Sequence, residues 1–260
     1  MCNIECFRSL MKLLKIKNKK EILAWSLYDF ANQPFTNIIV TFIYSSFFVK
    51  VIANNEQIGT TMWANTIALT AIIVSFFSPI LGAIADSGGF RKVFLILFTW
   101  ICAFSSALLY FPQSGDVFLA LTLFLIANIS FEMGSIFCNT YLVDLSEKKN
   151  IGSISGFAWG LGFVGGLIAL FLALFFFPDL DSVSIRKINI LVAIWLLFFS
   201  IPAFLFLKER KKEKFTILHI INSFNQIKNT FRSVSKYKVI SQFLLARLFF
   251  NDALITIFAL

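Results

Sequence analysis

The chain has 260 residues, of which 58% are hydrophobic and 17% are aromatic, and its mean hydropathy is +0.81. A water-soluble globular domain does not carry so much apolar sequence, so the composition indicates a membrane protein whose first partner is the lipid bilayer. The net charge of +9 does not indicate a nucleic-acid partner, because most of the basic residues lie between apolar segments on one side of the predicted membrane.

Seven apolar segments are long enough to cross a bilayer, which takes about 20 helical residues. Their continuous apolar runs lack the alternation of barrel strands, so they predict helices and an all-α membrane protein. The predicted spans are residues 25–49, 61–85, 93–111, 117–141, 151–177, 188–207 and 239–260. Because the last span ends at Leu260 inside an apolar run, we interpret the chain as a fragment.

The basic residues divide the chain into four predicted parts and set its orientation. Of the 23 Lys and Arg residues, 19 lie in the N-terminal tail or after the second, fourth and sixth spans, whereas Lys50, Arg186 and Lys187 lie on the other side. The positive-inside rule therefore predicts a cytoplasmic N-terminus. The predicted parts are a basic amphipathic tail over 1–24, a six-helix bundle over 25–207, a cytoplasmic loop over 208–238 and a seventh helix over 239–260.

The first predicted span contains polar residues in the segment WSLYDFANQPF, residues 25–35. Ionisable groups inside a membrane are costly and commonly mark function. One interpretation is that this helix face lines an aqueous pathway, loosened at Pro34. The alternative is that Asp29, about 14 Å along the axis from Lys20, lies near the headgroups or pairs with a lysine. The candidate substrate or water contacts on this span are Asp29, Asn32, Gln33 and Thr36.

The fourth and seventh predicted spans are the other two with ionisable residues in their interiors. Glu132 lies near the middle of the fourth span and is the candidate for proton or substrate coupling. Arg247 and Asp252 lie in the seventh span and are expected to form the opposing wall. Three further polar residues share the Glu132 face at helical spacing, namely Asn128, Ser135 and Asn139. We therefore expect the first, fourth and seventh spans to surround one water-filled pathway.

The fifth predicted span is rich in glycine. Glycines repeated every fourth residue let helices approach closely, and a glycine-dense helix also suits a gate that bends or slides. The candidate packing and gating residues are Gly152, Gly156, Gly160, Gly162, Gly165 and Gly166.

The sequence offers no candidate catalytic or metal-binding cluster. Its four cysteines, Cys2, Cys6, Cys102 and Cys138, have no metal-ligand spacing, and its single histidine, His219, lies in a predicted loop. We therefore expect neither an enzyme nor a metal or other cofactor. The remaining alternatives are a transporter and a non-transporting membrane scaffold or receptor-like protein.

The connection between the second and third spans reads GAIADSGGFRK. Its simplest interpretation is a tight turn that carries positive-inside charges. It also resembles the cytoplasmic loop signature of the major facilitator superfamily, but departs from it at Ser87, where a basic residue is usual. In that superfamily the loop locks the two six-helix halves together, which implies that its partner lies in the opposite half. The matching residues are Gly82, Asp86, Gly89, Arg91 and Lys92.

Four segments resemble the autophagy-linked vacuolar effluxer-like branch of that superfamily: WSLYDFANQPF, YLVDLS, ISGFAWGLGFVGG and ARLFFNDALITIFA. The resemblance runs from Trp25 to Leu260 and implies a twelve-helix fold, of which this chain supplies the N-terminal six-helix bundle and the first helix of the second bundle. It implies a bacterial-type multi-pass protein of the cytoplasmic membrane that exports a small polar metabolite such as an amino acid by alternating access. The candidate coupling ion is the proton, because Glu132 is the candidate coupling residue. Gly162 stands where the antiporter motif has proline.

Overall fold

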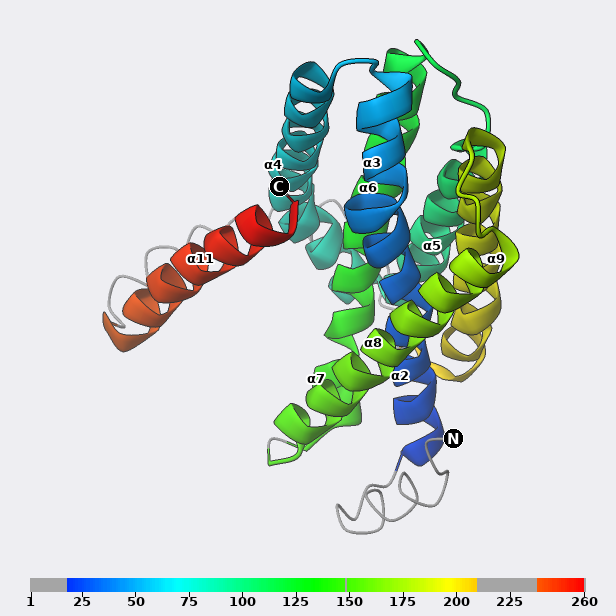
Figure 1. The fold of residues 1–260 in the computed structure, drawn as a ribbon. Coiled ribbons are helices and arrows are strands. Elements are labelled where there is room, and N and C mark those ends of the chain that lie inside the picture. The colour runs from blue at the N-terminus through cyan, green and yellow to red at the C-terminus, as the bar shows by residue number, and fades with distance from the viewer. Residues whose placement is uncertain (1–17, 148, 210–237, 260) are drawn as a thin grey trace.

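The computed structural model describes residues 18–147, 149–209 and 238–259, and all regular elements in these ranges are helical (Figure 1). The N-terminal tail up to residue 17 and most of the predicted loop over 208–238 lie outside the described residues. The elements are α2 (Lys19–Pro34), η1 (Phe35–Phe42), α3 (Tyr44–Phe47), η2 (Phe48–Ile52), α4 (Glu56–Gly88), α5 (Arg91–Leu108), α6 (Val117–Thr140), α7 (Leu142–Leu145), α8 (Ile151–Phe176), α9 (Ser182–Phe206) and α11 (Lys238–Ala259).

Six helices among the described residues are long and apolar enough to cross a membrane, as expected for the first six predicted spans. The first is longer than predicted, because the helix already begins at Lys19 and continues to Ile52. The expected seventh span is helical as α11, but an apolar helix is established only for Ser241–Phe250 among the described residues, so its crossing of the membrane stays a prediction. The six are Lys19–Ile52, Glu56–Ala85, Arg91–Leu108, Val117–Leu145, Ile151–Phe176 and Ser182–Phe206.

The first crossing changes its helical form at Pro34. Proline has no backbone N–H and its ring crowds the preceding turn, so a regular α-helix is hard to continue through it. Here α2 ends at Pro34 and the π-helix η1 follows directly, in agreement with the loosening expected at this position. The crossing therefore combines an ordinary α-helical half with a wider half.

Helix α2 lies inside the bundle, where it packs mainly against α8 and α9, while α5 packs against α6 and α9, and α4 against α6 (Figure 1). The aromatic side chains Trp25 and Tyr28 of α2 are buried, as is Phe35 at the start of η1. Farther along the first crossing, Phe48 packs near Trp63, whose ring stacks on Phe124 at 3.8 Å between centroids. The core is thus built around the first crossing.

Three of the helix ends are set by capping residues. Asn55 begins α4 by accepting a hydrogen bond at its side-chain oxygen from the Ile58 N–H at 3.0 Å, and Asp181 begins α9 in the same way with the Ser184 N–H at 3.0 Å. Helix α4 ends at Gly88 and is capped by Gly89, whose φ of 65° is the left-handed conformation that glycine adopts readily.

Candidate functional site

A pocket of about 470 Å³ lies between η1, α4 and α6. Glu132 is exposed in this pocket and is the one ionisable residue among those that line it in the described part of the chain. A carboxylate in a membrane-length helix is costly unless it meets water or a polar partner, and this pocket provides such a place. The lining residues are Thr36, Val40, Thr41, Ile67, Thr70, Ala71, Val74, Ser75, Asn128, Phe131 and Glu132.

Each wall of the pocket contributes a polar group. Thr36 comes from η1 just after Pro34, and Thr70 comes from α4, where its hydroxyl donates to the Thr66 carbonyl at 3.0 Å. Asn128 lies one turn before Glu132 on α6 and is buried. The pocket can therefore offer hydroxyl and amide groups beside one acid to a polar solute.

Aromatic stacking fixes the two helices that carry most of this site. The ring of Phe131, next to Glu132 in the chain, stacks on Phe35 at 4.8 Å between centroids. Near the end of α2, the Asn32 amide donates to the Ser135 hydroxyl at 3.3 Å, which joins the two predicted polar faces. The hydrogen bond pairs the helices as the sequence suggested, although neither of these two polar residues lines the pocket.

Asp29 and Gln33 do not line the pocket, contrary to the expectation of a single shared passage. They face α8 instead: a Cβ atom built on Gly162 would lie 3.3 Å from the Asp29 Cβ, and one built on Gly166 would lie 2.8 Å from the Gln33 Cγ. The Gln33 amide donates to the Asn37 side-chain oxygen at 3.3 Å. Residues three and four apart cover a broad arc of a helix, so the polar residues of α2 face two neighbouring helices: Asn32 faces α6, whereas Asp29 and Gln33 face α8.

The predicted glycine contacts on α8 also divide into two groups. Gly162 and Gly165 lie directly against α2, and Gly166 lies against the end of α2 and the start of η1, so close helix approach is found there. A Cβ atom built on the other three glycines would meet no described atom within 4 Å, so the predicted packing is not found for them among the described residues. The first half of α8 slants away from α2 in Figure 1, which leaves Gly152, Gly156 and Gly160 facing open space.

The remaining predicted cavity residues lie apart from the pocket. Asn139 is exposed near the end of α6, and Arg247 is exposed on α11, which lies to one side of the bundle in Figure 1. The side chain of Asp252 lies outside the described part of the structure. An opposing wall made by Arg247 and Asp252 therefore stays a prediction.

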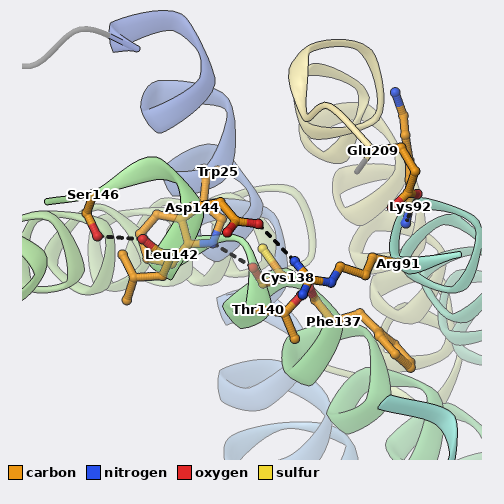
Figure 2. A network of polar contacts seen from close by, with 10 residues as sticks. All are labelled: Trp25, Arg91, Lys92, Phe137, Cys138, Thr140, Leu142, Asp144, Ser146 and Glu209. Carbon is orange, nitrogen blue, oxygen red and sulfur yellow. Dashed lines mark hydrogen bonds and ion pairs between the residues drawn. The ribbon is translucent and has the colours of Figure 1, made fainter. Parts of the chain in front are cut away.

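A polar network joins the α4–α5 turn to the ends of α6 and α9 (Figure 2). The Arg91 guanidinium Nη1 lies 2.9 Å from the Asp144 carboxylate on α7, with side-chain exposures of 7% and 28%. The backbone N–H of Lys92 donates to the Glu209 carboxylate at 2.8 Å. The nearly buried Arg91 thus anchors the turn within this bundle.

Within this chain Arg91 pairs with Asp144, because α7 brings that acid to the end of the bundle where the turn lies. The implication of the loop signature, that its acid and cations meet the opposite half of the fold, stays a prediction. The segment YLVDLS contains this acid, but nothing in its pattern shows that the acid turns toward the α4–α5 turn. Within the signature, Gly82 faces open space, and nothing is described of the Asp86 side chain.

Residues 49–260 match the sequence model of the family described as vacuole effluxer Atg22 like. The chain belongs to this family. The matched range includes Glu132, Arg91 and Asp144, while the polar segment of α2 lies before it. This finding confirms the resemblance to the vacuolar effluxer-like branch and its all-α fold.

Two curated proteins resemble this member of the Atg22 like family. The chain is 28% identical over 249 residues to a Bacillus subtilis (strain 168) protein named uncharacterized MFS-type transporter YxiO, covering 92% of the chain and 58% of the relative. It is 28% identical over 197 residues to an Aquifex aeolicus (strain VF5) protein named uncharacterized protein, covering 74% of the chain and 47% of that relative. The chain thus spans about half the length of these relatives. No solved structure matches it.

Proposed function

We propose that this chain forms part of a secondary transporter that moves a small polar solute past Glu132 by alternating access. The observation that carries the proposal is the pocket itself, in which a carboxylate from the middle of a membrane-length helix lies beside an amide of the same helix and hydroxyl groups from two other crossings. Transporters of this architecture bind solutes near the bilayer midplane, between structural repeats. The family and the name of the Bacillus subtilis relative support this reading.

Within this proposal the pocket residues have distinct roles. Glu132 takes up a proton or a cationic group of the solute, because it supplies the charge among the described lining residues. Asn128 and Thr36 orient the solute by hydrogen bonds. The Arg91–Asp144 pair holds the α4–α5 turn on the bundle while the bundle tilts.

We propose an amino acid as the solute and efflux as the direction. The support is the description of the family as vacuole effluxer like, together with the resemblance of the first crossing to that branch. The pocket volume of about 470 Å³ is in the range of small-molecule sites.

The test is a flux measurement on the full-length gene product in proteoliposomes loaded with a mixture of radiolabelled amino acids. With an imposed pH gradient, the wild type should release label faster, and Glu132→Gln should lose this dependence. Glu56→Gln is the matched control, because Glu56 is an exposed acid at the start of α4. An unchanged gradient response in Glu132→Gln would remove the coupling role, and an absence of flux from the wild type would favour a scaffold or receptor-like protein.

A further inference from the structure

A second hollow lies between the C-terminal end of α8 and the first two thirds of α9. Its volume is about 690 Å³, and it shares no lining residue with the pocket at Glu132. All but one of its lining residues are aliphatic or aromatic, so we refer to it as the apolar groove. They are Leu172, Phe176, Phe177, Lys187, Ile190, Leu191, Ile194, Trp195, Phe198 and Phe199.

The length of the apolar groove matches one leaflet of a bilayer. From Lys187 to Phe199 it follows thirteen residues of α9, and the twelve steps between them at about 1.5 Å each give roughly 18 Å. Half of the hydrocarbon core is about 15 Å thick. Because Lys187 lies near the start of this membrane-length helix, the groove runs from the membrane interface toward the midplane.

The charge at the mouth of the groove is positive. Lys187 is exposed and forms no ion pair among the described residues. The neighbouring Arg186 is engaged elsewhere: its Nε donates to the Ser182 carbonyl at 3.0 Å, and its guanidinium lies 5.6 Å from the Tyr110 ring centroid. The nearest acid along the chain, Asp181, feels the charge of Lys187 but forms no ion pair with it and accepts the capping hydrogen bond from Ser184. The Lys187 ammonium is therefore the cation that a ligand in the groove would meet.

We propose that the apolar groove binds an anionic glycerophospholipid, with an acyl chain along α9 and the headgroup phosphate at the Lys187 ammonium. A lysine at a membrane interface extends its charged end toward the headgroups while its methylene stem covers apolar surface. The inference depends on the chain lying in a membrane and does not depend on the proposed transport activity.

The bound acyl chain would be connected to the first crossing through one side chain of α9. Trp195 lines the groove, and its indole N–H donates to the Phe30 carbonyl of α2 at 3.2 Å. The Phe30 ring stacks on the Trp195 ring at 5.2 Å between centroids. The lipid therefore lies against the side chain that ties α9 to α2.

The experiment is native mass spectrometry of the detergent-solubilised chain titrated with phosphatidylglycerol or with phosphatidylcholine. Lys187→Ala removes the cation, and Ile194→Trp fills the groove at a side chain that is 63% exposed. The matched controls are Lys50→Ala, an exposed lysine at the same end of the bundle, and Ile201→Trp, an exposed position of α9 that does not line the groove.

We expect the wild type and both controls to retain phosphatidylglycerol equally, and Lys187→Ala to bind it about fivefold less tightly. Ile194→Trp should lower retention of both lipids. Equal binding by Lys187→Ala and the wild type, or equal binding of the two lipids by the wild type, would overturn the proposal. Circular dichroism of each variant checks folding, and Lys187→Ala alone decides the headgroup assignment if Ile194→Trp does not fold.

Discussion

The backbone carbonyl of Phe30 accepts a hydrogen bond from the indole nitrogen of Trp195 at 3.2 Å. In a regular α-helix this carbonyl would bond to the N–H of residue 34, but residue 34 is proline and has none. The proline of the first crossing thus frees a carbonyl that α9 uses. This explains how the WSLYDFANQPF segment can carry a proline inside a packed bundle.

Replacing Trp195 with phenylalanine should destabilise the bundle, because the ring stack on Phe30 is kept while the donor is lost. A carbonyl left without its partner inside a protein costs about 1–3 kcal/mol. The measurement is the free energy of unfolding in mixed detergent micelles. Trp159→Phe on α8 is the control, since Trp159 is 71% exposed, and an equal effect of both substitutions would contradict the role of the hydrogen bond.

Two glycine substitutions on α8 should have opposite effects. A Cβ atom at Gly165 would lie 2.6 Å from the Phe30 carbonyl oxygen, so Gly165→Ala must push α8 and α2 apart at a cost of about 1–3 kcal/mol. Gly156→Ala meets no described atom within 4 Å and gains about 1 kcal/mol in helix propensity.

Thermal unfolding of both variants in the same detergent checks this pair. A destabilised Gly156→Ala would show that its face is packed against a part of the protein beyond the described residues, and a neutral Gly165→Ala would contradict the close approach to α2.

The Arg91–Asp144 ion pair should contribute more to the free energy of unfolding than an exposed pair does. Asp144→Asn leaves the nearly buried guanidinium with a weaker acceptor, and we expect a loss of about 1.5–3 kcal/mol in unfolding free energy. The control is Glu147→Gln, because the Lys149–Glu147 pair is exposed on both sides and pairs of that kind contribute about 0–1 kcal/mol.

A double-mutant cycle with Arg91→Gln measures the coupling within the Arg91–Asp144 pair directly. Additive losses in that cycle would show that the two charges do not stabilise each other.

The cap at the start of α9 should respond to acid. Hydrogen bonds from Ser184 lower the pKa of Asp181 below its ordinary value of 3.8. A carboxyl with a lowered pKa stabilises the folded state at pH values above 3.8, and this contribution is lost as the pH falls through the lower folded pKa. Amide hydrogen exchange at Ser184 should therefore accelerate relative to a mid-helix amide of α9 on acidification. Asp181→Asn keeps an amide acceptor and should remove this pH dependence.

Much of the fold follows from the sequence, because the length of an apolar run is set directly by the thickness of the bilayer. Glu132 was found for a similar reason, since an acid in the middle of such a run is rare and informative. The placement of Asp29 was not predictable, because periodicity shows that polar residues share one side of a helix but does not show which neighbour faces that side. Asp144 was missed as a partner of Arg91 because the short helix α7, which turns it toward the α4–α5 turn, has no signal of its own.

The Arg91–Asp144 contact has a consequence for engineering. Both partners belong to one contiguous segment of about fifty residues, so the contact requires nothing from the remainder of a longer polypeptide. A chimaera that fused residues 19–209 to the second half of a different relative would carry the contact across intact. Any loss of stability or function in such a hybrid would therefore come from a mismatch between the two fused segments, because the Arg91–Asp144 contact is the same as in this chain.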